Sequence, residues 1–129
     1  MRVLLDTHVL LWWLLGDDRL SGARRDALAN PDTEVWVSAA SGWEIATKHR
    51  IGKLGLAPRV VHDLPQILAE QHFRVLEISL AHALRAGSLP GAHRDPFDRM
   101  LAAQSVLENL PIVSADDALD ALGAERLAP

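Results

Sequence analysis

The stretch Val3-Leu4-Leu5-Asp6-Thr7-His8 decides the fold of this 129-residue chain, because an apolar run ends there abruptly in a carboxylate. Val3 to Leu5 show no alternation of apolar and polar residues, which is typical of a strand buried on both faces of a parallel sheet. An ionised carboxylate at the end of such a strand is costly unless a cation or hydrogen-bond donors meet it. Open α/β sheets bind their ligands at this edge, so Asp6 is the first candidate functional residue.

The composition is that of an ordinary globular protein, and we expect a single domain spanning residues 1–129. Cysteine is absent, which excludes disulfides and thiolate metal sites. The longest apolar run, Val9–Leu15, is too short to span a bilayer, and the N-terminus lacks the order of a signal peptide. We therefore expect a cytoplasmic protein without a membrane partner. The net charge of -4 does not exclude RNA, because divalent metal would neutralise a carboxylate cluster.

Strands and helices alternate along the chain. After the first strand, the sequence predicts strands at Glu34–Ser38, Val75–Ser79, Pro111–Ser114 and around Glu125–Leu127. It predicts helices at Thr7–Leu15, from the cap Ser21 through Leu28, at Ala39–Ile51, from Pro58 to about Gln71 with an interruption at Pro65, at Leu80–Ser88 and at Phe97–Leu107. This order predicts an α/β fold with a parallel sheet and helices on both of its faces.

Four acids occupy comparable positions in this scheme. Asp6 and Asp116 follow strands, while Glu44 and Asp98 lie in helices that begin at the same edge of the sheet. Grouped carboxylates raise one another's pKa values unless a cation compensates. Their hard oxygen ligands favour Mg²⁺ or Mn²⁺, and such a site suits hydrolysis of phosphodiesters.

Each acid also has a purely structural interpretation. Asp6 and Asp95 suit helix N-caps, and Asp116 suits the start of the last helix. Ser41 and Glu44 fit a capping box, but only if the helix begins at Ser41. Capping does not require the acids to share one edge of a sheet, so we favour a common functional role.

Four motifs in the chain together carry a family resemblance: Asp6–Thr7, Ser38–Ala46, His93–Gln104 and Val113–Asp116. They resemble the motifs of PIN-domain ribonucleases and, more closely, of VapC-type toxins of bacterial toxin–antitoxin pairs. Each motif alone is weak evidence, whereas four in the right order over nearly the whole chain are specific.

The resemblance implies a PIN-like three-layer α/β/α sandwich with a central, mostly parallel sheet of four to five strands. It also implies an endoribonuclease that uses Mg²⁺ or Mn²⁺ to hydrolyse RNA phosphodiester bonds. A VapB-like antitoxin would neutralise it by placing a C-terminal segment in the acidic groove. Homodimers are common in the family, so we expect one here.

The resemblance also assigns roles to individual residues. Asp6 and Asp98 match the principal metal ligands, and Glu44 would help to hold metal or water. Asp116 matches a more variable fourth acid, and Asp95 is a further candidate contributor. The hydroxyls at two other positions, Thr7 and Ser114, would support the site.

Basic and aromatic side chains are candidates for RNA contacts. Charge would bring the RNA backbone to a set of five basic residues, Lys48, Arg50, Lys53, Arg94 and Arg99, although a solvated face explains them almost as well. Any of four tryptophans, Trp12, Trp13, Trp36 and Trp43, can stack bases, and the first two suit a core or a partner-binding groove better.

The sequence leaves one functional alternative open, a catalytically silent module that keeps the fold and its RNA or protein contacts. Other phosphoryl-transfer proteins fit less well. A receiver domain needs an Asp where this chain has Ser79, and an aspartyl phosphatase needs one where it has His8. A DNA flap nuclease needs long insertions that this chain lacks.

Overall fold

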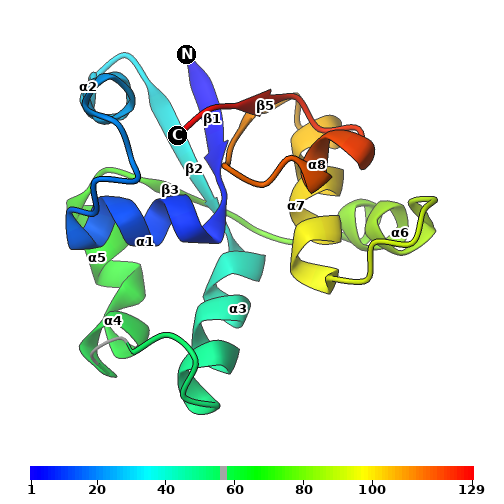
Figure 1. The fold of residues 1–129 in the computed structure, drawn as a ribbon, viewed down its shortest axis with the longest axis horizontal. Coiled ribbons are helices and arrows are strands. Elements are labelled where there is room, and N and C mark those ends of the chain that lie inside the picture. The colour runs from blue at the N-terminus through cyan, green and yellow to red at the C-terminus, as the bar shows by residue number, and fades with distance from the viewer. Residues whose placement is uncertain (56–57) are drawn as a thin grey trace.

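A five-stranded sheet forms the centre of the computed structural model, which describes residues 1–55 and 58–129 (Figure 1). Every neighbouring pair of strands is parallel, and the strand order is β3-β2-β1-β4-β5. The expected parallel sheet is confirmed. Its strands are β1 (Arg2–Leu5), β2 (Glu34–Ser38), β3 (Arg74–Leu76), β4 (Ile112–Val113) and β5 (Arg126–Leu127).

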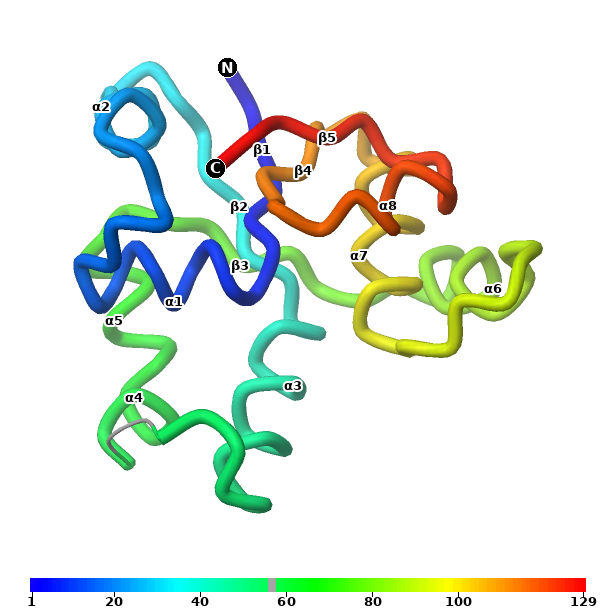
Figure 2. The backbone as a smooth tube through the Cα atoms, viewed as in Figure 1, coloured from blue at the N-terminus to red at the C-terminus, as the bar shows by residue number. Residues whose placement is uncertain are grey.

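Helices cover both faces of the sheet (Figures 1 and 2). On one face lie α1 (Thr7–Leu15), α2 (Gly22–Ala29) and α5 (Leu64–Glu70). On the other lie α7 (Pro96–Leu107) and α8 (Ala118–Ala121), with α6 (Leu80–Ser88) packed against α7. Two further helices, α3 (Ala39–Arg50) and α4 (Pro58–His62), extend beyond the carboxyl edge of the sheet.

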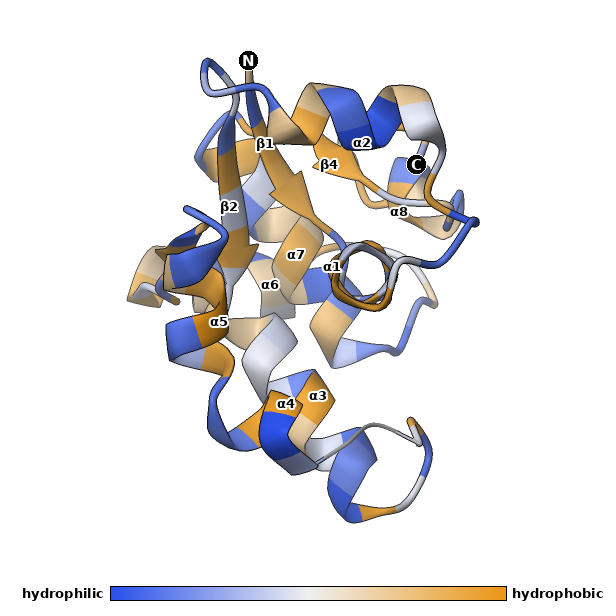
Figure 3. Cartoon of the chain, turned by 90° about the vertical axis from the view of Figure 1, so that its left-hand side faces the viewer, coloured by the Kyte–Doolittle hydropathy of each residue, from blue (hydrophilic) through white to orange (hydrophobic). Residues whose placement is uncertain are grey.

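The central strand β1 is buried on both faces, as its unbroken apolar run predicts. Val3 and Leu5 pack under α1, α2 and α5, whereas Leu4 packs under α7 and α8. None of these three side chains is exposed. Figure 3 shows the resulting concentration of apolar residues on the inner strands. The expected three-layer α/β/α arrangement is therefore confirmed.

The structure corrects the expected single helix from Pro58 to Gln71. It contains two helices, α4 and α5, with a break at Asp63. Pro65 causes the break, because its ring has no N–H to donate to Val61 and would collide with the carbonyl of that residue in a continuous helix.

The third strand is shorter and begins earlier than expected. Only Arg74–Leu76 pairs, against Trp36–Ser38 of β2. The neighbouring strand β2 ends at Ser38, which caps α3. The residues after Leu76 therefore have no strand to pair with. Each helix that the structure describes is too short or too polar to cross a lipid bilayer.

Candidate active site

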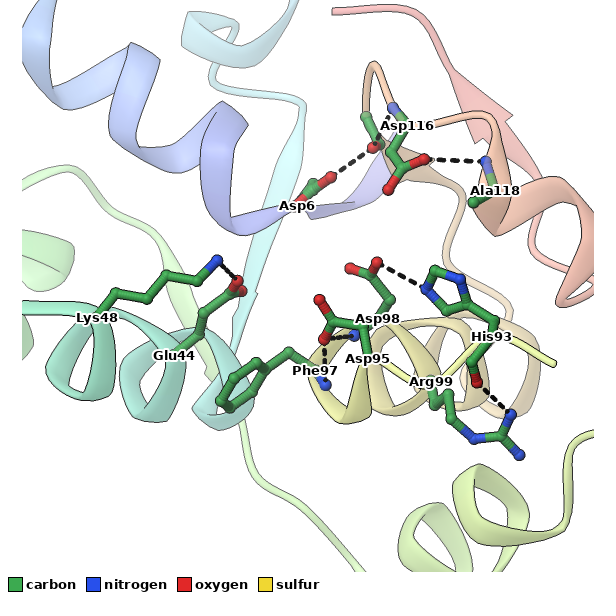
Figure 4. Close-up of polar contacts among 11 residues, drawn as sticks. Asp6, Glu44, Lys48, His93, Asp95, Phe97, Asp98, Arg99, Asp116 and Ala118 are labelled. Atoms are coloured by element: carbon green, nitrogen blue, oxygen red, sulfur yellow. Dashed lines mark hydrogen bonds and ion pairs between the residues drawn. The ribbon is translucent and has the colours of Figure 1, made fainter. Parts of the chain in front are cut away.

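The acidic residues gather where the chain changes direction across the sheet. From β1 the chain proceeds to β2 and β3 on one side, and later it returns to β4 and β5 on the other side. The ends of β1 and β4 therefore form a topological switch point, where open α/β sheets place their ligand crevice. Asp6 directly follows β1, and Asp116 lies in the turn after β4 (Figure 4).

Asp6 is buried at this crevice, with 5% of the residue exposed. Its Oδ1 accepts a 3.4 Å hydrogen bond from the backbone N–H of His8, so it caps α1. Its Oδ2 accepts a hydrogen bond from the Ser114 hydroxyl, whose oxygen accepts a 2.9 Å bond from the N–H of Asp116. Burial raises the pKa of Asp6 more than the Ser114 hydroxyl lowers it, and the charge of Glu44 raises it further.

Thr7 connects α1 to the beginning of α3. Its hydroxyl donates a 2.9 Å hydrogen bond to the Ser41 hydroxyl, and both residues are buried. The helix α3 is capped by Ser38, whose side chain accepts a hydrogen bond from the N–H of Ala40. Because α3 begins before Ser41, Glu44 belongs to no capping box and lies in the second helical turn.

Glu44 and Lys48 form an ion pair within the crevice (Figure 4). Only 4% of the Glu44 side chain is exposed, and Lys48 Nζ donates to its Oε2 from one helical turn further on. Burial lowers the pKa of Lys48, but the hydrogen bond to Glu44 and the charges of Glu44, Asp95 and Asp98 outweigh it and raise the pKa. Lys48 therefore partly balances the acidic charge.

The first turn of α7 brings two more carboxylates to the crevice. Asp95 caps the helix, and its Oδ1 accepts hydrogen bonds from the N–H groups of Phe97 at 2.9 Å and Asp98 at 3.2 Å. Asp98 Oδ2 lies 3.0 Å from His93 Nε2. An ionised carboxylate can only accept, so His93 donates this bond. Within the described residues, the other oxygen of each carboxylate has no protein partner and faces the crevice.

The raised pKa of Asp98 reflects the acids around it. Its pKa is raised to about 6 by the sum of several effects: burial, the largest, raises it, the hydrogen bond from His93 lowers it, and the charges of Asp95, Asp6 and Asp116 raise it. The structure thus brings these four carboxylates within electrostatic range of one another. Glu44 is a fifth, because its charge raises the pKa of Asp6.

This donor set fits a hard divalent cation. In residues 1–55 and 58–129, no three acidic or histidine side chains lie close enough together to hold a metal ion between them. Mg²⁺ keeps several of its waters and needs only one or two protein carboxylates. Two carboxylates with raised pKa values meet that requirement: the half-buried Asp98, with one oxygen facing the crevice, and the buried Asp6 at the end of β1.

The basic residues differ in their access to solvent. Arg50 and Lys53 are exposed near the far end of α3, and Arg94 is exposed beside His93. Arg99 instead donates to the backbone carbonyls of Ala86 and His93, each at 3.0 Å, and to that of Leu89. Its guanidinium is committed to the protein's own backbone, so the structure gives Arg99 a different role from the expected RNA contact.

Two of these contacts go beyond the sequence-based expectations. The pairing of Glu44 with Lys48 has a visible signal, because residues four apart on a helix are neighbours. The bond between His93 and Asp98 has no such signal, since it crosses from a loop to a helix.

A separate hollow of about 690 Å³ lies at the opposite edge of the sheet, beside the beginnings of β2 and β3.

The fold and the crevice define a class of α/β protein that carries a polycarboxylate site at the carboxyl edge of a parallel sheet. The chain belongs to the PIN domain family, whose model matches residues 3–125. It is 34% identical over 115 residues to Ribonuclease VapC22 of Mycobacterium tuberculosis (strain ATCC 25618 / H37Rv), a match that covers 88% of this chain and 86% of that protein. The resemblance seen in the sequence motifs is confirmed.

Solved structures share the fold at lower sequence identity. VapBC2 from Rickettsia felis, bound to a DNA fragment from its promoter, matches 99% of this chain and 98% of its own with a TM-score of 0.74 and 14% identity. VapBC-1 from nontypeable Haemophilus influenzae matches 99% and 98% with a TM-score of 0.71 and 15% identity. FitAcB from Neisseria gonorrhoeae matches 100% and 98% with a TM-score of 0.67 and 20% identity.

Proposed function

We propose that this chain is a cytoplasmic, Mg²⁺- or Mn²⁺-dependent endoribonuclease toxin acting as one domain, neutralised by a VapB-like antitoxin. The observation that carries the proposal is the crevice at the ends of β1 and β4, where five carboxylates lie within electrostatic range of one another and Lys48 offsets only part of their charge. Membership of the PIN domain family and the match to a ribonuclease support it.

The side chains around the crevice prepare its carboxylates for this task. Asp6 and Asp98 would be the principal ligands, with Glu44, Asp116 and Asp95 as further contributors. When bound, a divalent ion would lower the pKa of its water, so that hydroxide is available as the nucleophile near neutral pH, and it would neutralise charge on the phosphate. Ser114 orients Asp6, His93 orients Asp98 and Lys48 orients Glu44 through hydrogen bonds.

Exposed cations would hold the RNA while these groups act. Arg50, Lys53 and Arg94 can contact phosphates through charge, and Lys48 can do so from inside the crevice. Attack by water on phosphorus breaks the bond to the 3′ oxygen and leaves a 5′-phosphate and a 3′-hydroxyl. A cyclic or 3′-phosphate product would contradict this reaction.

The decisive experiment is cleavage of a mixed RNA pool by purified protein with Mg²⁺ or Mn²⁺ against EDTA. We expect metal-dependent cleavage that Asp6→Asn abolishes and that Asp26→Asn, a matched change at an exposed acid of α2, leaves intact. Cleavage that survives EDTA, or survives Asp6→Asn in a folded protein, would overturn the proposal. A folded wild type that binds no metal and cuts no RNA would favour the silent module.

The antitoxin and a homodimer complete the proposal. VapBC and FitAB complexes share this fold, and a basic peptide segment complements an acidic crevice. We expect induced expression of the wild type alone to arrest bacterial growth and Asp6→Asn to relieve the arrest. Light scattering on the purified protein tests the dimer, and a monomer at micromolar concentration would exclude a stable one.

A further inference from the structure

An exposed tryptophan lies next to the acidic crevice. Trp43 immediately precedes Glu44 in α3, and 57% of the residue is exposed. The other tryptophans, Trp12, Trp13 and Trp36, are partly buried against the two halves of the core. Trp43 therefore combines a large open aromatic surface with a position beside a buried carboxylate.

A second aromatic side chain, from the facing helix, holds this indole in place. Phe97 lies in the first turn of α7 and immediately precedes Asp98. The two ring centroids are 4.7 Å apart and the planes meet at 75°, an edge-to-face contact that favours one orientation of the indole. In the view of Figure 4, Phe97 is drawn between Glu44 and Asp95.

We propose that Trp43, braced by Phe97, is a stacking platform for one unpaired nucleobase of an RNA whose phosphate lies at the carboxylates. This inference rests on the proposed function and names its substrate class. On both walls an aromatic residue directly precedes a carboxylate, so base and phosphate of neighbouring nucleotides would meet adjacent residues of the protein. Stacking on an exposed indole is tolerant of base identity, because every base has a π face.

The surroundings of Trp43 suit a nucleotide chain better than a protein partner. One and two turns further along the same face of α3 lie Ala46, Thr47 and Arg50, which are small or polar, and beyond them Ile51, a single exposed apolar residue at the helix end. Arg50 is exposed about 10 Å along the helix from Trp43, within reach of a neighbouring phosphate. A protein interface would need a broader apolar surface around the ring.

The platform selects for single-stranded or loop RNA. A base inside a duplex has both faces covered by its neighbours and cannot stack on the indole without leaving the helix. Duplex RNA of the same sequence should therefore bind more weakly than the single strand, although it carries more charge.

The test measures how tightly an Asp98→Asn protein binds octaadenylate, a single-stranded RNA, in the presence of Mg²⁺. The Asp98→Asn substitution is chosen because it should leave the RNA uncut. In this background, Trp43→Ala should weaken binding roughly 5- to 150-fold. Trp43→Phe should retain most of the affinity, whereas Trp43→Leu, which keeps apolar area without a π face, should lose it. Leu84→Ala, a truncation of an exposed apolar residue on α6, is the matched control and should change nothing.

A set of octaadenylates with one abasic position each makes the test specific. At one position, the missing base should weaken binding to the Asp98→Asn protein that keeps Trp43. The same missing base should not weaken binding to the Trp43→Ala variant any further, because the contact is already lost there. Three results would each overturn the platform. The Trp43→Ala variant could bind as tightly as its Asp98→Asn parent, the abasic position and Trp43→Ala could each weaken binding by independent factors that multiply, or the parent could fail to bind the RNA. Loss of the dimer in Trp43→Ala with unchanged RNA affinity would assign Trp43 to a protein interface instead.

The proposed function can fail separately from the platform. If wild-type protein shows the base-dependent binding but cuts no RNA with metal, the platform stands and the nuclease proposal falls. If the wild type cuts RNA and Trp43→Ala does so with unchanged KM, the platform falls and the nuclease proposal stands.

Discussion

Replacing Asp98 by Asn should stabilise the metal-free protein while removing its cleavage activity. Burial and the charges of Asp95, Asp6 and Asp116 raise the pKa of Asp98 to about 6, against 3.8 for the free side chain. The Asn side chain removes the charge but keeps an oxygen that can accept the hydrogen bond from His93. The substitution therefore separates the cost of the buried charge from the geometry around it.

The sign follows from the raised pKa. The folded protein binds the Asp98 proton more tightly than the unfolded chain does, so stability is lost as pH rises from about 4 through 6. A pKa difference of this size corresponds to about 3 kcal/mol, and screening by solvent at a partly exposed site reduces it to about 1.5 kcal/mol. Asp98→Asn should thus match the wild type near pH 4 and exceed it by about 1.5 kcal/mol at pH 7.

Urea denaturation in EDTA at several pH values between 4 and 7.5 measures this difference, with Asp26→Asn as the control for loss of an exposed acid. Adding Mg²⁺ or Mn²⁺ should then stabilise the wild type more than Asp98→Asn, because only a protein that binds the ion gains stability from it. An Asp98→Asn protein that is no more stable at pH 7, or that differs from the wild type equally at every pH, would refute the reasoning.

Three further substitutions test the groups that orient the acids. His93→Ala should weaken Mn²⁺ binding by about 10- to 100-fold in titration calorimetry, while His93→Gln, which keeps a donor, should lose less; equal affinities would remove His93 from the site. Arg99→Met should lower the free energy of unfolding by about 2 to 4 kcal/mol in urea, because three backbone carbonyls lose a charged donor. Ser114→Ala removes a bond that lowers the pKa of Asp6, so the acidic limb of the cleavage–pH profile should move to higher pH; an unmoved limb would contradict this.

Much of the local structure follows from the sequence alone. The limits of α1 and α6 agree with the prediction, and Ser21, Ser38 and Asp95 cap the helices that they precede. These features depend on residues only a few positions apart: a side-chain oxygen that accepts from the helix it begins, or a glycine such as Gly16 with φ of 67° that ends one. The assignment to the PIN domain family also follows from motifs readable along the chain.

The sequence was less informative where a partner decides the outcome. The extent of β3 depends on where β2 stops offering hydrogen bonds, and no pattern within Val75–Ser79 reports that. Arg99 looked like an RNA contact because its charge was visible, whereas the three carbonyls that occupy it come from Ala86, Leu89 and His93.

By itself, the sequence determined the alternating α/β order, the strand that ends in Asp6 and the set of acids worth considering. Only the tertiary structure decided that β1 lies next to β4, so that Asp6 and Asp116 share one crevice, and that His93 meets Asp98 there. The physical reason is that capping and helical periodicity are local, while burial and the field of neighbouring charges arise from segments far apart in the chain. The raised pKa of Asp98 and the contact of Trp43 with Phe97 exist only once those segments have come together.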